Sequence, residues 1–259
     1  QFSISDYSPI SCFNGSTQIT VDSVWGGTPS VYVYEINDNG ATGIGIFSNV
    51  QAGEKFITVT DQVNGCTVDT TIVIDEPGEL IVQLPNIIEI ELGDTLTRLN
   101  PTIVSGGAPI DTFIWSPSDF LSCADCKNPI VNTSEDQVFQ LTVIDANGCV
   151  ATAEVRVDID KNRNVYIPNV FSPNGDGIND LFRVFTGAGV EAINFVRIYD
   201  RWGELMFEAN DLPPSGDGTS PGWDGTFRGR VMKPAVFMYL IEVRFVDEKV
   251  LLYRGDVTL

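Results

Sequence analysis

One short polar stretch, residues 172–180, carries the side chains of this sequence that are best placed to do chemistry. It reads SPNGDGIND. Its spacing is similar to that of a calcium-binding loop, in which oxygen ligands alternate along the chain and a glycine, here Gly177, makes the sharp bend. The residues that would bind the ion are Ser172, Asn174, Asp176, Ile178 through its backbone carbonyl, and Asp180. Calcium is therefore the one cofactor that the sequence suggests.

A compact turn explains the same stretch without a metal. Asn and Asp side chains accept hydrogen bonds from nearby backbone N–H groups, and glycines supply positive φ angles. Two positions also depart from the calcium pattern, because Ser172 stands where Asp is usual and Arg183 stands where a bidentate Glu is expected. Both alternatives stay open. Neither places a nucleophile beside a base, so we do not predict catalysis here.

The composition narrows the classes of function. The chain has 259 residues, a formal net charge of -20 and no His. A strongly acidic surface argues against binding nucleic acid or anionic membranes, because both attract Lys and Arg. The lack of His removes the commonest general base and the usual zinc ligand. No apolar run approaches the length of a membrane span. We therefore predict a protein that is not an enzyme and has no transmembrane segment.

The elements that must position the polar stretch are β-strands. Short runs with alternating side chains, such as ITVDSV, VYVYEI, FITVTD, FQLTVID and FVRIYD, are separated by Gly, Asn, Asp and Pro. Period-two alternation rich in Val, Ile, Thr and aromatic residues indicates half-buried strands. Many short strands with regular turn signals are typical of β-sandwiches. The predicted fold class is all-β, with Ig-like β-sandwich domains in tandem.

An internal repeat sets the domain organisation. GGTPSVYVYEI (26–36) is answered by GGAPIDTFIWS (106–116), and ITVTDQVNGC (57–66) by LTVIDANGC (141–149). The repeat length of about 80 residues suits one sandwich. We predict three domains: module 1 (residues 1–78), module 2 (residues 79–160) and module 3 (residues 161–259). Interfaces between them are expected to be small, so that the row of modules flexes.

Three sets of motifs resemble known families. SCFNGSTQITV with ITVTDQVNGC, in module 1, is similar to the SprB-type repeats of Bacteroidota surface adhesins. IWSPSDFLSCADCKNP with LTVIDANGC, in module 2, resembles the PKD-like or Ig-like modules of the same large proteins. Module 3 contains IPNVFSPNGDGINDLF, VRIYDRWGELMF, GWDGTFRG, VFMYLIEV and GDVTL in order. It resembles the gliding-motility-associated C-terminal domain, the type B sorting domain of the type IX secretion system.

This last resemblance implies export to the cell surface. The partners that it implies are the type IX translocon and its shuttle components, and the implied location is extracellular. The residues that carry the sorting motif are Pro173, Asn174, Gly175, Asp176, Gly177, Asn179, Asp180, Arg201, Trp202, Gly203, Trp223, Asp224 and Gly225. We expect Ile167 and Val170 to enter the first strand of module 3, and Leu181 and Phe182 to re-enter its core. Trp202 and Trp223 are expected to be buried against the sandwich.

The five cysteines suggest two disulfides. Cys12 and Cys66 lie near the first and penultimate strands of module 1, as in an inter-sheet disulfide. Such a loop of roughly 55 residues would contribute about 4 kcal/mol in the chain-entropy model. Cys123 and Cys126 are expected to form a local bond. Related modules pair the counterpart of Cys149 with a Cys that is replaced here by Glu91, so Cys149 is expected to be free and buried.

These observations favour a secreted cell-surface protein. Residues 1–160 would be non-catalytic spacer or adhesin modules, with a glycan, a protein or another copy of the chain as the surface ligand. Two alternatives stay open: the chain is the C-terminal tail of a large secreted hydrolase, or it is a subunit of an extracellular fibre.

Overall fold

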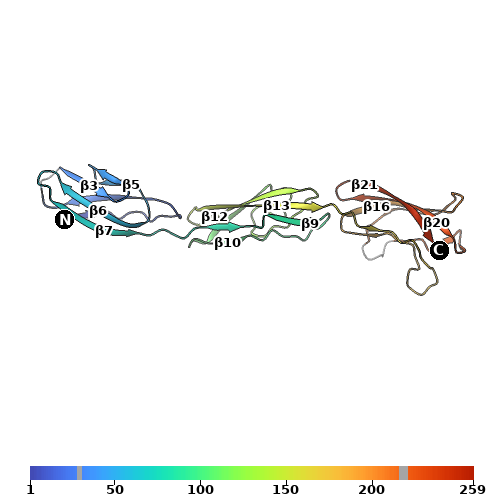
Figure 1. The fold of residues 1–259 in the computed structure, drawn as a ribbon. Coiled ribbons are helices and arrows are strands. Elements are labelled where there is room, and N and C mark those ends of the chain that lie inside the picture. The colour runs from blue at the N-terminus through green and yellow to red at the C-terminus, as the bar shows by residue number, and fades with distance from the viewer. Residues whose placement is uncertain (28–30, 216–220) are drawn as a thin grey trace.

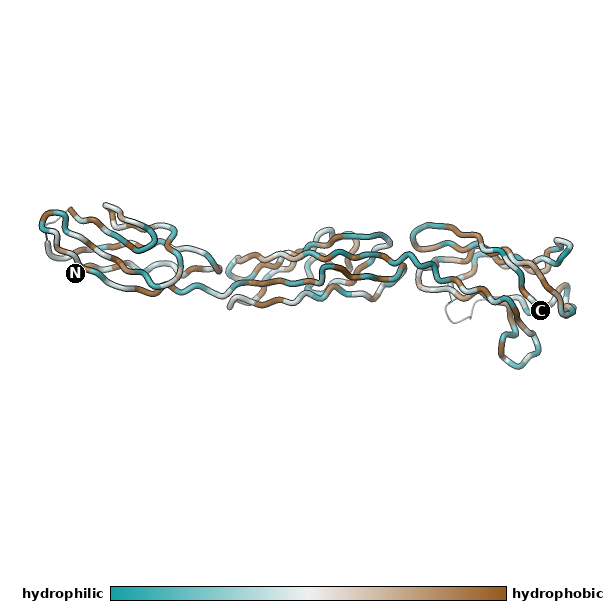
Figure 2. The backbone as a smooth tube through the Cα atoms, in the orientation of Figure 1, coloured by the Kyte–Doolittle hydropathy of each residue, from teal (hydrophilic) through white to brown (hydrophobic). Residues whose placement is uncertain are grey.

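The computed structural model describes residues 1–27, 31–215 and 221–259. These residues form strands, turns and loops without a helix, and Figure 1 shows three β units in a row. Hydrophobic and hydrophilic residues alternate along the strands in Figure 2. The expected all-β sandwich fold is confirmed. Because no helix is present in this part of the chain, none could serve as a membrane span.

Module 1 is a two-sheet sandwich. Its strands are β1 (Phe2–Ile4), β2 (Thr17–Val24), β3 (Tyr32–Ile36), β4 (Gly40–Thr42), β5 (Ile46–Val50), β6 (Gly53–Asp61) and β7 (Thr67–Ile74). One sheet has the order β1-β2-β5 and the other β4-β3-β6-β7. Alternate side chains of both sheets enter one core, as Ile19 and Phe47 do from the first sheet and Ile57 from the second. The period-two pattern therefore directs one face of each strand inward.

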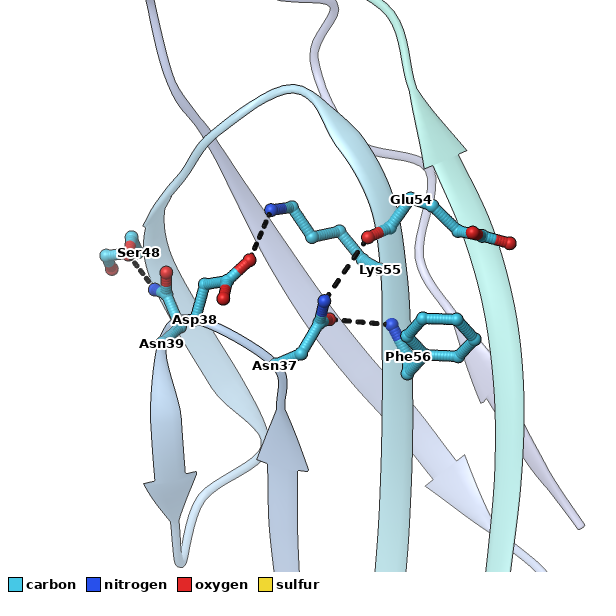
Figure 3. A network of polar contacts seen from close by, with 7 residues as sticks. All are labelled: Asn37, Asp38, Asn39, Ser48, Glu54, Lys55 and Phe56. Atoms are coloured by element: carbon cyan, nitrogen blue, oxygen red, sulfur yellow. Dashed lines mark hydrogen bonds and ion pairs between the residues drawn. The ribbon is translucent and has the colours of Figure 1, made fainter.

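A polar turn closes the β3–β4 hairpin of module 1, as Figure 3 shows. The side-chain oxygen of Asn37 accepts from the backbone N–H of Phe56 at 2.7 Å, and its amide donates to the carbonyl of Glu54 at 3.3 Å. The Lys55 side chain is only 6% exposed, and its ammonium lies 3.4 Å from the carboxylate of Asp38. Asn37 thus continues the pairing with β6 beyond Ile36.

Module 2 is built on the same plan. Its strands are β8 (Ile81–Gln83), β9 (Ile87–Glu91), β10 (Thr102–Val104), β11 (Ile110–Ser116), β12 (Gln137–Asp145) and β13 (Val150–Asp160). β10 pairs with β8, and the larger sheet has the order β11-β12-β13-β9, with β13 and β9 parallel. Trp115 is buried, and its indole N–H donates to the carbonyl of Cys126 at 2.9 Å. The loop that contains the Cys123–Cys126 disulfide therefore lies over the core.

Module 3 packs its core on one face of a four-stranded sheet. Its strands are β14 (Val165–Tyr166), β15 (Phe185–Thr186), β16 (Val190–Tyr199), β17 (Leu205–Leu212), β18 (Thr226–Phe227), β19 (Arg230–Val231), β20 (Val236–Phe245) and β21 (Val250–Thr258). The large sheet has the order β17-β16-β20-β21, and β14–β15 and β18–β19 form two small ribbons. Phe171, Phe182 and Trp223 come from the loops between these elements and are buried in the core.

The cysteines pair differently from the expectation. Cys12 is bonded to Cys149 of module 2, with their Cα atoms 5.5 Å apart, and Cys66 is free and exposed. The loop of Cys12 lies beside the end of β7, because the Asn14 N–H donates to Glu76 at 2.7 Å. Cys66 is the residue before Thr67, at the opposite end of the eight-residue strand β7. At 3.3 Å per residue, this strand separates Cys66 from the loop of Cys12 by about 26 Å. The predicted Cys12–Cys66 bond and the free, buried Cys149 are therefore both wrong.

Both junctions between modules are held by specific contacts. The Cys12–Cys149 bond links modules 1 and 2 covalently, which restricts the bending expected from small interfaces. At the second junction, a Cβ at Gly93 would lie 2.3 Å from the carbonyl oxygen of Ala188, so these loops touch. Arg163 forms an ion pair with Asp247 in the β20–β21 turn, and both side chains are mostly buried. The linker into module 3 is thus attached to the domain that it leads into.

Candidate functional site

The polar stretch 172–180 folds as a loop that satisfies its own hydrogen bonds. Both carboxylate oxygens of Asp180 accept from the loop backbone, one from the N–H of Gly175 at 2.7 Å and the other from the N–H of Gly177 at 2.8 Å. Asp176 accepts from the Ile178 N–H at 2.8 Å and from the Asn174 side chain at 2.8 Å. Gly175 and Gly177 have φ angles of 79° and 84°, in the region that favours glycine.

These contacts explain why the acidic residues are present. The hydrogen bond from the Asn174 side chain, followed by the bond from the Ile178 backbone, lowers the pKa of Asp176 below its ordinary value. The N–H donors thus favour the ionised form of Asp176. The side-chain oxygens of Asp176 and Asp180 that would bind a calcium ion are thus acceptors of hydrogen bonds within the loop. Among residues 1–27, 31–215 and 221–259, no cluster of three or more His, Cys, Asp or Glu side chains suited to a metal occurs. The hydrogen bonds between the side chains and the backbone of the loop are those of the turn alternative.

We expect the loop to gain no stability from calcium. The melting temperature of the 259-residue chain should be the same in excess EDTA and in millimolar calcium. A bound ion at a hundredfold excess over its Kd would instead add about 2.7 kcal/mol, or roughly 10–20 °C for a domain of about 100 residues.

Matched variants of Asp180 separate the turn from a metal site. Asp180→Ala should cost about 1 kcal/mol, because the amides of Gly175 and Gly177 lose their acceptor but remain open to water. Asp180→Asn keeps one acceptor oxygen and should cost less. A calcium-dependent melting shift that Asp180→Ala abolishes would overturn the turn interpretation.

The GWDG motif forms the centre of the module 3 core. Trp223 is only 1% exposed, and its ring lies 5.4 Å from the ring of Phe171 and 4.8 Å from that of Phe237. The backbones of Trp223 and Phe182 exchange hydrogen bonds of 2.8 and 3.1 Å. The Asp224 carboxylate accepts from Thr226, whose hydroxyl lowers the pKa of Asp224. The motif therefore attaches the segment that follows the 172–180 loop to the core.

The RWG motif forms the turn between β16 and β17, and Trp202 is exposed rather than buried. The Asp200 carboxylate accepts from the N–H groups of Trp202 and Glu204, both at 2.8 Å. Gly203 completes the turn with a φ angle of 84°. The turn projects Trp202 beyond the last sheet pair, Tyr199 with Met238, and its side chain is 84% exposed. The expected burial of Trp202 is thus wrong, whereas Trp223 is buried.

The start of module 3 also differs by one residue from the expectation. Phe171 is buried, whereas Val170 is 56% exposed and pairs with Thr258 in an isolated parallel bridge. Ile167 packs against the core without belonging to a strand. Phe182 is buried as expected, next to the half-buried Leu181. A slip of one position exchanges the inward and outward faces, which the pattern of hydrophobic residues alone does not fix here.

The sorting motifs collect at one end of module 3, which we call the motif end: residues 172–180, 200–204 and 223–231, and Leu259. β16 and β21 end there while β17 and β20 begin there, since Tyr199 pairs with Met238 and Val236 with Thr258. A Cβ at Gly225 would lie 2.9 Å from Leu259 and 3.1 Å from Pro173. Figure 1 shows this end and the C-terminus at the far end of the row of modules.

Charged and aromatic contacts join the loops of the motif end. Arg228 lies 3.3 Å from the carboxylate of Glu204 and stacks 4.6 Å above the ring of Phe227. Sequence reasoning did not identify this pair, because Arg228 and Glu204 belong to different motifs that only the sheet brings together. Large hydrophobic side chains remain exposed on these loops: Ile178, Trp202 and Val231. The motif end therefore combines a hydrogen-bonded frame with an accessible outer surface.

Comparison with known families identifies the domain that carries these motifs. Residues 165–258 match the CHU_C type IX secretion signal domain. Module 3 is a type IX secretion signal domain. The signal domain accounts for the ordered motifs, and it marks the protein as one secreted by the type IX system. No curated protein matches the chain significantly.

Several solved structures show a distant likeness to the chain. Latent dimeric PorU from Porphyromonas gingivalis is 15% identical, with 100% of this chain and 33% of that chain covered and a TM-score of 0.28. A tetra-tandem repeat from the extending region of a large adhesion protein is 14% identical, with 100% and 74% covered and a TM-score of 0.32. Fibronectin(III)-like modules of Clostridium thermocellum CbhA are 11% identical, with 62% and 94% covered and a TM-score of 0.26.

Proposed function

We propose that residues 1–160 serve as non-catalytic spacer and adhesin modules, and that the signal domain holds the protein at the cell surface after export. The observation that carries this proposal is the end-to-end row of sandwiches, with the signal domain at one end (Figure 1). The Cys12–Cys149 bond supports a spacer role, since it fixes two modules in line. Such a row would display module 1 at a distance from the export signal.

The motif end is the surface on which the type IX machinery docks in this proposal. It lies away from the junction with module 2, where Gly93 touches Ala188, so modules 1 and 2 leave it uncovered. Trp202 offers a large apolar surface at its tip. Exposed tryptophans are frequent among the residues that dominate binding energy at protein interfaces. Arg228 and Glu204, at 77% and 51% side-chain exposure, add charges around it.

Export can be tested with a fluorescent reporter in a bacterium that has a working type IX system. A reporter fused to residues 161–259 should leave the cell, whereas the same reporter fused to residues 1–160 should stay in the periplasm. A strain that lacks the translocon should retain both fusions. Periplasmic retention of the 161–259 fusion in the competent strain would contradict the assignment of the export signal.

The same fusion tests surface retention. After export, the reporter should sediment with washed cells and be digested by protease added outside. Recovery of all the reporter in the medium would overturn retention at the surface and leave export unaffected. The two parts of the proposal therefore fail separately.

A further inference from the structure

Cys66 is the one cysteine of the five that has no partner within the chain as described. It is exposed and lies in the turn between β6 and β7. Figure 1 shows this hairpin turning at the end of module 1 that is remote from module 2. Neither the export signal nor the core of module 1 uses its thiol.

The internal repeat gives Cys66 a counterpart in module 2. Asp61 and Cys66 close the β6–β7 hairpin, with the Asp61 N–H donating to the Cys66 carbonyl at 2.9 Å. Asp145 and Cys149 close the β12–β13 hairpin through the same bond at 3.0 Å. The turn of module 1 is longer by one residue, yet the two cysteines occupy the same position in the strand ladder. Their thiols are therefore displayed at equivalent ends of their modules.

The counterpart is bonded to the neighbouring module. Cys149 reaches the loop of residues 8–17, where it is joined to Cys12, and the Asn147 side chain donates to the Ser11 carbonyl at 3.4 Å. The hairpin end of one module thus receives the Ser-Cys loop of the module stacked on it. Within the described residues, this bond between a hairpin cysteine and a loop cysteine occurs once. Cys66 is the hairpin cysteine of module 1, at the end of that module remote from module 2, and it has no loop cysteine opposite it.

A recess beside Cys66 provides a second sign of a missing neighbour. It has a volume of about 190 Å³ and is lined by Cys66, Trp25, Tyr32 and Val68, among others. Trp25 is 57% exposed there. Its counterpart in the repeat, Ser105 of VSGG, precedes Gly106, where an added Cβ would lie 2.0 Å from the carbonyl of Gly78. The equivalent end of module 2 is thus in contact with the segment that leads out of module 1.

We propose that Cys66 forms a second inter-module disulfide, with the Cys12-type loop of a further module stacked on module 1 in the same polypeptide. If the bond is repeated, the hairpin cysteine of each module is joined to the loop cysteine of the module before it. Successive modules are then held in line. The ligand of Cys66 is therefore a thiol in a loop of the SCFNG kind. This inference does not depend on the proposed adhesin function.

The reaction needs an oxidant with its own disulfide. Each of the two protein thiols loses its proton, one protein S–S bond forms, and the S–S bond of the oxidant is reduced to two thiols. Oxidised glutathione supplies this chemistry in a test and leaves as two molecules of reduced glutathione. An oxidising compartment outside the cytoplasm suits such bonds.

A tandem protein tests the proposal directly. Residues 1–79 are placed before Gln1 of the full chain, so that Glu79 of the added copy precedes Gln1 as it precedes Leu80 in the native junction. After refolding with oxidised and reduced glutathione, we expect Cys12 of the added copy to be joined to Cys66 of the full chain in non-reducing peptide maps. Thiol titration should give one free thiol per chain, Cys66 of the added copy, whereas three would be free without the new bond.

A matched variant completes the test, and two outcomes would contradict the proposal. Cys66→Ser in the full-chain part should raise the number of free thiols from one to two and leave Cys12–Cys149 intact. Three free thiols in the parent tandem protein would overturn the proposal. So would disulfide-linked dimers of the tandem protein through Cys66 of its full-chain part, because the bond would then join separate polypeptides.

Discussion

Replacing Trp223 with alanine should destabilise the signal domain by about 3–5 kcal/mol, the usual cost of removing a fully buried tryptophan. The side chain is 1% exposed, packs on Phe171 and Phe237, and donates its indole N–H to the Thr226 carbonyl at 2.8 Å. For a domain of about 100 residues, the loss lowers the melting temperature by at least about 12 °C. Calorimetry of the 259-residue chain would show one transition displaced while those of modules 1 and 2 stay.

Trp202 provides the matched control, since it is the same residue type in the same domain at 84% exposure. Trp202→Ala should leave the melting temperature within about 4 °C, because surface substitutions usually stay within 0.5 kcal/mol. If the motif end docks on the export machinery, the extracellular reporter should nevertheless fall about tenfold or more, as when an interface hot spot is lost. Unchanged export by a folded Trp202→Ala domain would exclude Trp202 from the docking surface.

Loss of the Cys12–Cys149 bond should have the second large effect. Its ends are 137 residues apart in sequence, and the chain-entropy model gives about 5 kcal/mol for a loop of that length. This free energy is shared between two modules that each retain a core. The Cys12→Ser/Cys149→Ser variant should therefore show lowered and separated unfolding transitions for modules 1 and 2 in calorimetry. Small-angle scattering should show a broader distribution of interatomic distances, because the junction is free to bend.

Cys66→Ser serves as the control for that experiment. Cys66 is exposed and unbonded in this chain, so the variant should melt within about 4 °C of the parent. The opposite result, with Cys66→Ser lowering stability by several kcal/mol and thus as strongly as the double variant, would restore the pairing of Cys12 with Cys66, since both variants would break that bond. Non-reducing peptide maps of the parent chain decide between the two pairings independently.

The sequence predicts the strands well, because one-sided burial imposes a period of two that is visible locally. β12 contains the LTVID run, and its positions alternate between buried and less buried. Trp223 could likewise be placed in the core. The pairing of Cys12 could not be predicted, since it depends on which end of a module each loop occupies. Trp202 was misplaced for a related reason: hydrophobicity favours burial, whereas the hydrogen bonds of Asp200 commit the RWG segment to a projecting turn.

The Cys12–Cys149 bond also determines how the protein carries a mechanical load. When the molecule is pulled at its ends, force passes from Cys12 to Cys149 through covalent bonds, across Cα atoms 5.5 Å apart. Most of modules 1 and 2 lies in the 137-residue span between these cysteines, which fully extended would reach about 450–490 Å. This span does not bear the force and cannot extend as long as the disulfide is intact. Reduction would release it, so the oxidation state of one bond sets the extensibility of the tether.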